Sequence, residues 1–283
     1  MNSMLKELKY GAKNYKTLNI IIKKGKGIYL TDVNNKRYLD FLSGYSAVNQ
    51  GHCHPRLLNI LNKQSKNLTI TSRAFYNNKL GEFSEYITNM FNYDKFLPMN
   101  TGVEGGETAI KIARKWGYEV KNVPNNKAVN LFCKNNFWGR TISAISSSTD
   151  KYSYNNFGPY TEGFDIIDYN NLDSLERKLK SNSNIVSYML EPIQGEAGVI
   201  IPDKNYLKSV YKLCKKYNVL LICDEIQSGL GRSGKLLASH YDNINPDILI
   251  LGKSLSGGFY PISGVLANEE IMNVIKPGEH GST

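Results

Sequence analysis

Two short apolar runs, at 219–223 and 248–251, stand out in a chain of otherwise mixed polarity. Turn-forming residues bound each run, and each is too short for a core helix. An uninterrupted run of this kind is typical of a strand that is buried on both faces of a parallel sheet. We therefore expect two such strands at the centre of the fold.

The rest of the chain alternates between strand-like and helix-like patterns. The predicted helices are 80–91, 103–120, 172–179 and 206–217. The further predicted strands are 95–99, 127–133, 164–167, 185–190 and 261–266. This alternation predicts an α/β fold with a doubly wound, mostly parallel sheet.

The first part of the chain has a different pattern. Segment 10–24 predicts an extended entry, and 25–41 alternates apolar and polar residues on both sides of Asn34-Asn35, which is a hairpin signal. Segment 42–55 is rich in Gly, Ser, Asn and His and predicts a functional loop. Pro55 then opens a helix that we expect to run from about 56 to 67.

Two side chains of opposite charge follow the two central strands. Asp224 comes directly after the first apolar run, and Lys253 follows the second with one glycine between. Ligands of open α/β sheets bind at the carboxyl ends of the strands. Pyridoxal phosphate needs a lysine for its Schiff base and an acid for its ring nitrogen. The residues themselves leave open a second interpretation, in which both side chains are solvated caps of their strands.

A strand, the turn Asn100-Thr101-Gly102 and a helix follow one another near the middle of the chain. This geometry binds phosphate, because the free N–H groups and the helix dipole point at the anion. An ordinary turn between a strand and a helix, with no ligand, would have the same sequence pattern.

Composition excludes several classes of protein. The 283 residues are 41 % hydrophobic and carry a net charge of +10, but the basic residues are scattered and form no stripe. We therefore expect no nucleic-acid partner. No apolar run approaches a membrane span, so we expect no membrane partner. The first residues resemble neither a secretory nor an import signal, and we expect a cytoplasmic protein.

The cysteines and histidines suggest no metal or disulfide framework. Cys133 and Cys223 lie in apolar runs and are expected to be small core residues. His52 and His54 flank Cys53, but no further ligand lies near them in the sequence, so a turn before a helix is favoured over a metal site.

Several motifs together resemble the class III pyridoxal-phosphate-dependent aminotransferases, and within them the enzymes that act on ornithine. The motifs are S-G-Y-S-A-V-N-Q-G-H-C-H-P, T-S-R-A-F-Y-N-N, M-N-T-G-V-E-G-G-E-T-A, N-F-W-G-R-T, S-S-S-T-D, E-P-I-Q-G-E-A-G-V, D-E-I-Q-S-G-L-G-R-S-G, L-G-K-S-L-S-G-G-F-Y-P-I-S and I-K-P-G-E-H-G-S-T. The resemblance implies fold type I, with a mostly parallel seven-stranded sheet and helices on both faces. It also implies a homodimer with shared active sites. Residues 1–45 would belong to a small domain and 46–283 to a large cofactor-binding domain.

The resemblance assigns the cofactor site residue by residue. Lys253 would bind pyridoxal 5'-phosphate covalently and then act as the acid and base that moves the proton. Asp224 would pair with the ring nitrogen. The other residues matched to cofactor contacts are Thr101, Gly102 and Val103 (phosphate), Phe137 (ring stacking), Gln227 (ring hydroxyl) and Thr283 (the phosphate of the partner subunit).

The resemblance assigns the substrate site in the same way. Tyr15, Tyr45 and Arg140 match residues that grip the α-amino and α-carboxylate groups of ornithine. Glu191 and Glu196 match family acids, and Glu196 resembles the one that pairs with a distal arginine until 2-oxoglutarate arrives. The implied small-molecule substrates are ornithine and 2-oxoglutarate, and the products are glutamate 5-semialdehyde and glutamate.

The sequence reaches Thr283 within a family motif, so we expect the C-terminal part of the small domain to be absent from this chain. Two alternatives to the ornithine enzyme remain. One keeps the fold and acts on acetylornithine or 4-aminobutyrate, although Tyr45 argues against the latter. The other is an inactive remnant that binds pyridoxal phosphate or a protein partner.

Overall fold

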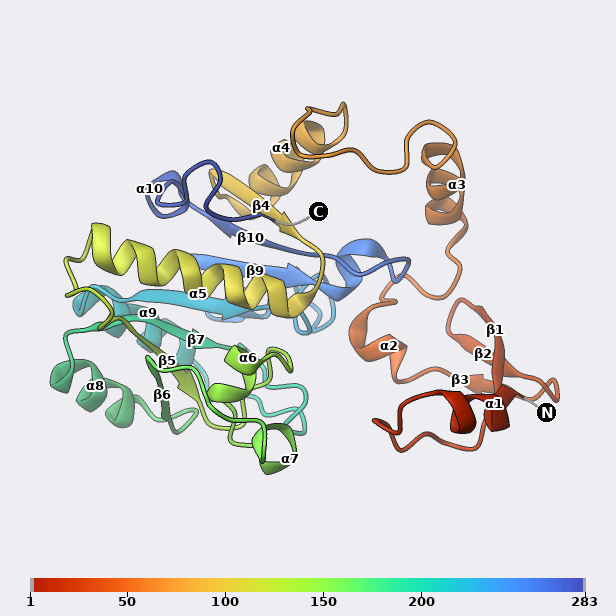
Figure 1. The fold of residues 1–283 in the computed structure, drawn as a ribbon, viewed down its shortest axis with the longest axis horizontal. Helices are drawn as coiled ribbons and strands as arrows, with labels where there is room; N and C mark the ends of the chain where they lie inside the picture. The colour runs from red at the N-terminus through yellow and green to blue at the C-terminus, as the bar shows by residue number, and fades with distance from the viewer. Residues whose placement is uncertain (1–2, 282–283) are drawn as a thin grey trace.

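A seven-stranded sheet runs through the centre of the molecule in the order β4-β10-β9-β8-β7-β5-β6 (Figure 1). The computed structural model describes residues 3–281. The strands are β4 (Lys95–Met99), β5 (Val129–Cys133), β6 (Phe164–Ile167), β7 (Ile185–Leu190), β8 (Leu220–Asp224), β9 (Ile248–Gly252) and β10 (Ser263–Ala267). The predicted mostly parallel seven-stranded sheet is confirmed, because β6, β5, β7, β8 and β9 pair in parallel.

Strand β10 is the exception, since it runs antiparallel to both β4 and β9. The sequence predicted this strand but not its direction. Parallel neighbours need a crossover of a dozen or more residues, usually a helix. The segment between Gly252 and Ser263 is shorter than that and contains only the single turn η2 (Lys253–Ser256), so the chain reverses.

Helices cover both faces of the sheet (Figure 1). The long helix α5 (Gly102–Glu119) packs across one face. The other helical segments of the large sheet are α4 (Leu80–Phe91), α6 (Ile142–Ser146), α7 (Lys151–Tyr154), α8 (Leu172–Ser181), α9 (Tyr206–Lys216), η1 (Ala238–Tyr241) and α10 (Glu269–Met272).

Strand β9 shows why the apolar runs are uninterrupted. Ile248 and Ile250 belong to the core cluster that includes α5, while Leu249 and Leu251 pack in the cluster that includes α4. Successive side chains of a strand point to opposite faces, so a sheet covered on both sides needs apolar residues at every position. In β8 the side chains alternate in the same way: Ile222 packs in the cluster that includes α5, and Leu221 packs in the cluster on the opposite face.

The N-terminal residues form a separate three-stranded antiparallel sheet. Figure 1 shows this unit beyond the end of the large sheet at which β9 terminates. Its elements are α1 (Ser3–Tyr10), β1 (Ile22–Lys26), β2 (Tyr29–Asp32), β3 (Arg37–Leu39), α2 (Ser43–Ser46) and α3 (Pro55–Gln64). The expected hairpin is β2–β3, α1 was not predicted, and α3 ends three residues earlier than expected. The domain boundary near residue 45 stays a prediction.

Side chains of β2 and β3 hold the hairpin turn together. Asp32 Oδ1 accepts the N–H groups of Asn34 and Lys36, both at 2.9 Å, and its Oδ2 accepts the Tyr38 hydroxyl at 2.9 Å. Asn35 adopts a left-handed φ of 66°, which asparagine tolerates better than most residues. The Asn-Asn signal therefore marked the turn correctly.

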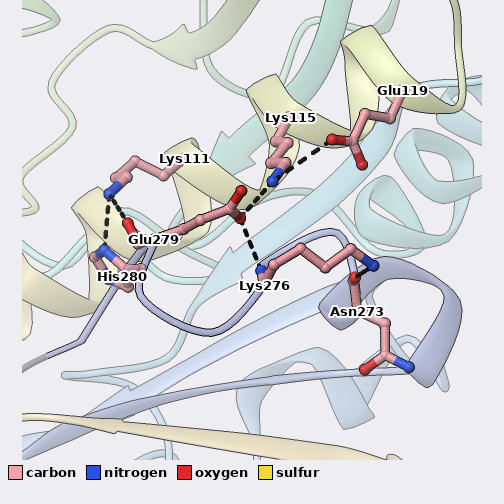
Figure 2. Close-up of polar contacts among 7 residues, drawn as sticks. All are labelled: Lys111, Lys115, Glu119, Asn273, Lys276, Glu279 and His280. Carbon is pink, nitrogen blue, oxygen red and sulfur yellow. Dashed lines mark hydrogen bonds and ion pairs between the residues drawn. The ribbon is translucent and has the colours of Figure 1, made fainter.

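The segment after α10 is fastened to the outer side of α5 (Figure 2). Glu279 forms an ion pair with Lys115, and Lys111 Nζ donates to His280 Nδ1 at 2.9 Å. The other ring nitrogen of His280, Nε2, lies 2.7 Å from Thr108 Oγ1. Burial and the neighbouring Lys111 ammonium lower the pKa of His280. The imidazole is therefore neutral near pH 7 and can accept from Lys111.

Within residues 3–281, no helix has both the length and the apolar character that crossing a membrane requires.

Candidate active site

A cavity of about 250 Å³ lies at the carboxyl ends of the central strands. The lining residues come from the ends of β7, β8 and β9, the start of α5 and the loop after β5. They are Gly102, Val103, Phe137, Trp138, Gly139, Glu191, Ile193, Asp224, Ile226, Gln227 and Lys253. Six predicted cofactor residues are therefore brought together: Gly102, Val103, Phe137, Asp224, Gln227 and Lys253.

Asp224 is the last residue of β8 and is 5 % exposed. Burial raises the pKa of its carboxyl to about 6, while the Ile226 N–H group and the Lys253 ammonium act in the opposite direction. Asp224 Oδ1 accepts that N–H group at 3.0 Å. The side chain is thus fixed in place and is mainly ionised at neutral pH.

Glu191, directly after β7, is a second buried carboxyl in the same cavity. Burial and the charge of Asp224 raise its pKa to about 8. Glu191 Oε1 accepts the N–H group of Phe137 at 2.9 Å. Of the two neighbouring acids, Glu191 is therefore the one that holds a proton at neutral pH.

Lys253 directly follows β9 and lies between two cavities. It lines the first and also a second cavity of about 410 Å³ that includes Thr101 and Ala47. Burial lowers the pKa of Lys253, and the carboxylates of Asp224 and Glu196 oppose this shift. Its backbone φ of 45° is left-handed, a conformation that glycine adopts far more readily than lysine.

The start of α5 offers backbone donors at the same edge. Thr101 is the N-cap, and its Oγ1 accepts the Glu104 N–H group at 3.4 Å while Glu104 Oε2 accepts the Thr101 N–H group at 2.7 Å. This reciprocal capping fixes the turn. At Gly102 a Cβ atom would lie 3.0 Å from Ile226 Cδ1, so glycine allows the turn to approach the loop after β8 closely. The N–H groups of Gly102 and Val103, in the first turn of this helix, can bind an anion.

The loop after β5 brings aromatic side chains to the cavity. Phe137 and Trp138 both line it, and Trp138 Nε1 donates to Ser147 Oγ at 2.8 Å. The indole lies so close to α5 that a Cβ atom at Gly106 would be 2.5 Å from Trp138 Cε3. The Arg140 guanidinium lies 5.6 Å from the centre of the Phe137 ring.

The predicted substrate residues are more scattered. Tyr15 is 71 % exposed and Tyr45 is 49 % exposed, and neither lines the two cavities beside Lys253. Arg140 Nη1 donates to Ser153 Oγ at 3.3 Å. Glu196 Oε1 accepts from Gln227 Nε2 at 3.2 Å, which connects it to the cofactor residues. Thr283 lies outside the described residues.

Tyr45 lies in a strained turn. Helix α2 is a single turn in which Gly44 and Tyr45 adopt left-handed φ and ψ angles, and Ser43 and Ser46 also have positive φ values of 53° and 72°. Left-handed backbone costs a non-glycine residue roughly 1–2 kcal/mol. Surrounding contacts must therefore hold this turn.

Sequence reasoning missed the apolar residues Ile193 and Ile226 and did not assign Trp138 or Gly139 to the cavity. Ile226 lies two residues after Asp224, and Trp138 and Gly139 directly follow Phe137. Proximity to the predicted site residues was therefore the available signal.

The histidine-rich loop has a structural partner. His52 Nε2 lies 2.6 Å from Asp40 Oδ2. Across residues 3–281, no group of three or more histidine, cysteine, aspartate or glutamate side chains is arranged to hold a metal ion.

Comparison with known proteins identifies the family. The sequence profile of class III aminotransferases matches residues 10–283. The chain belongs to the class III aminotransferases. A curated relative, the probable mitochondrial ornithine aminotransferase of Caenorhabditis elegans, is 60 % identical over 98 % of this chain and 66 % of its own length. The chain thus spans about two thirds of the length of such relatives.

Solved structures agree with this class III assignment. The ornithine aminotransferase of Toxoplasma gondii, in a structure with partial occupancy of PLP at its active site, superposes with a TM-score of 0.97 at 51 % identity, covering 99 % of this chain and 66 % of that one. The acetylornithine aminotransferase of Elizabethkingia anophelis reaches a TM-score of 0.88 at 49 % identity, covering 99 % and 67 %.

Class III aminotransferases depend on pyridoxal phosphate, and the residues of this cavity fit that cofactor. A lysine amine, a buried carboxylate and a helix start with backbone donors share one cavity. These are the three groups that an aldehyde, a ring nitrogen and a phosphate require. Gly102 supplies the close backbone approach.

Proposed function

We propose that this class III aminotransferase is an ornithine δ-aminotransferase, which transfers the δ-amino group of L-ornithine to 2-oxoglutarate and yields glutamate 5-semialdehyde and glutamate. Such a reaction would connect arginine metabolism with proline biosynthesis. The observation that carries the proposal is the shared cavity of Lys253 and Asp224 in a chain 60 % identical to a probable ornithine aminotransferase.

Pyridoxal phosphate, when bound, supplies an aldehyde that condenses with amines and a ring that withdraws electrons from the reacting carbon. Each residue of the site has a role in that chemistry. Asp224 keeps a negative charge at the end of β8, where it can hold a proton on a ring nitrogen. Glu191 stays neutral beside it and adds no second charge. Burial lowers the pKa of Lys253, which makes its Nζ a better proton acceptor and donor for the reaction than an exposed lysine amine.

The proposed substrate grip uses Tyr15, Tyr45 and Arg140 on the α-amino and α-carboxylate groups, which would direct the δ-amine of ornithine towards Lys253. What supports it is the position of the Arg140 guanidinium over Phe137, which lines the cavity. Glu196 would pair with the distal arginine of the family until 2-oxoglutarate arrives.

A second candidate is an acetylornithine aminotransferase, favoured by the 49 % identity to the Elizabethkingia enzyme. Acetylation removes the positive charge of one amine. A transferase of this kind would therefore discriminate the two substrates by what surrounds the amine that does not react. The 4-aminobutyrate enzyme and the inactive remnant remain as further alternatives, and the homodimer and the cytoplasmic location stay predictions.

Absorbance spectroscopy of the 283-residue chain tests the proposal. We expect added pyridoxal phosphate to give a visible band that Lys253→Ala lacks. Lys66→Ala is the matched control, because Lys66 is exposed and far along the chain from the site. We then expect ornithine to bleach the band at lower concentration than acetylornithine or 4-aminobutyrate.

Each outcome is informative. No band in folded wild-type protein would contradict the assignment of Lys253. A band that no amine alters would favour the remnant, and bleaching by acetylornithine at lower concentration than ornithine would favour the second candidate.

A further inference from the structure

The turn that carries Tyr45 is held by side chains from outside it. Within the turn, Tyr45 N–H donates to Leu42 O at 3.0 Å and Ala47 N–H donates to Ser43 O at 2.9 Å. These local bonds leave the left-handed backbone of Ser43 to Ser46 unfavourable. Such a conformation persists only where the surrounding structure over-determines it.

Asp40 holds the entrance of the turn. Its Oδ1 accepts the N–H groups of Leu42 at 3.1 Å and Ser43 at 2.9 Å. Its Oδ2 is hydrogen-bonded to His52, whose backbone pairs with Gly27 in the turn between β1 and β2. The entrance is thereby tied to the N-terminal unit.

Arg232 holds the turn from the large domain. Its Nη2 donates to Ser43 Oγ at 3.0 Å and also to Asn49 Oδ1. Ser43 directly precedes the segment 44–48, which contains Tyr45, and Asn49 directly follows it. Asn49 Nδ2 in turn donates to Leu230 O at 3.2 Å. Leu230 and Arg232 belong to the loop that follows Asp224, so one guanidinium connects that loop to both ends of the turn.

The opposite side of the turn lies against the loop that follows Lys253. A side chain at Gly258 would collide with Val48, which lies two residues after Ser46. Ala47 lines the second cavity together with Lys253. The turn is therefore placed between the loops that follow the two charged residues of the site.

We propose that Arg232 is a positioning residue for substrate selection: by bridging Ser43 and Asn49 it keeps the left-handed turn in the form that presents Tyr45 to an α-amino acid with a second amine. The inference rests on the proposed function, in which Tyr45 contacts ornithine. Arg232 itself need not touch substrate or cofactor.

Amide hydrogen exchange tests the clamp without any turnover. We expect Arg232→Ala to speed exchange of the Ala47 and Val48 amides by about tenfold or more, because the turn opens once its outer bonds are lost. Arg177→Ala, which removes an exposed arginine on α8, should leave these amides unchanged. Unchanged exchange in Arg232→Ala would overturn the clamp.

Spectral titration tests selection. In Arg232→Ala we expect the ornithine concentration for half-maximal bleaching to rise by about fivefold or more, while affinity for pyridoxal phosphate stays at the wild-type value. Arg232→Lys should recover only part of the loss, because an ammonium lacks the planar fork that spans two acceptors.

The two proposals fail in different ways. A wild-type chain that binds cofactor but never responds to ornithine contradicts the proposed function and the selection role with it, while exchange still decides whether the clamp exists. A response to ornithine that is unchanged in Arg232→Ala contradicts the inference alone. A parallel loss of cofactor and ornithine binding would also contradict it, since that marks a general structural role.

Discussion

The large sheet and the N-terminal unit bring residues to the same region by opposite means. Strands β7, β8 and β9 are buried along their whole length, and Glu191, Asp224 and Lys253 follow or end them. Among residues 3–45, only Asp32 and Ser43 are buried. Large apolar side chains there remain exposed, including Phe41 at 92 %.

The two regions differ in the kind of interaction that fixes their residues in place. The position of the charged residues follows from apolar packing, which is strong and non-directional. The position of Tyr45 follows from a few directional bonds made by Asp40 and Arg232. A single polar substitution can therefore move Tyr45, whereas the sheet should respond mainly to changes in its core.

The largest effect is expected in the core of the sheet. Ile222 in β8 is fully buried in the core cluster that also contains the apolar residues of α5. We expect Ile222→Ala to lower the free energy of unfolding by about 2–5 kcal/mol, because it leaves a cavity. Urea denaturation measures this, and a loss below about 1 kcal/mol would contradict the tight packing.

A pH-dependent effect of intermediate size should come from Glu191. Its folded-state pKa of about 8 lies above the usual 4.5, so its contribution to stability is present at low pH and is lost as pH rises through about 8. In cofactor-free protein we expect the melting temperature to fall as pH rises from about 4.5 to about 8. In Glu191→Gln the melting temperature should fall less over the same pH interval.

Glu85→Gln is the matched control for this measurement, since Glu85 is exposed on α4. Equal pH profiles for wild type and Glu191→Gln would show that Glu191 is not the group that titrates.

A smaller effect is expected where the C-terminal segment docks on α5 (Figure 2). The lowered pKa of His280 means that the unfolded chain binds more protons as pH falls below about 6.5, so docking weakens in acid. We expect the protection of the 276–281 amides, measured relative to their intrinsic exchange rate at each pH, to fall in acid, and His280→Gln to remove this fall. His240→Gln should retain it, and equal behaviour of the two variants would refute the role of His280.

The smallest effect is expected in the N-terminal sheet. Ile28 is 61 % exposed. Ile28→Ala should change the free energy of unfolding by no more than about 0.5 kcal/mol, because little apolar area is lost from burial. A cost comparable to that of Ile222→Ala in urea denaturation would mean that a partner, such as a second copy of the chain, covers this side chain.

The sequence predicted the large sheet well because its strands are buried on both faces and its helices have one apolar side. Predicted bounds for 80–91, 95–99, 164–167 and 185–190 agree with α4, β4, β6 and β7. Helix α1 was missed because its apolar residues, Leu5 among them, are not packed into a core. The direction of β10 depends on a connection length and not on the strand itself.

The site was predictable to a similar degree. Strand ends brought Asp224 and Lys253 together, as the rule for α/β sheets requires. The contact of Asp40 with His52 and the hydrogen bond from Arg232 to Ser43 could not be predicted. Their sequence separations match neither the helix period nor the strand period, so no sequence pattern indicates these contacts. The roles of Tyr15 and Tyr45 stay predictions.

The left-handed backbone of Lys253 has an evolutionary consequence. Replacement of Lys253 by glycine would relieve that backbone strain. A chain under no selection for its chemistry would therefore gain stability by losing the reactive amine. Backbone strain taken alone therefore favours glycine at this position. A lysine that stands there regardless is what continuing selection for a reaction would maintain.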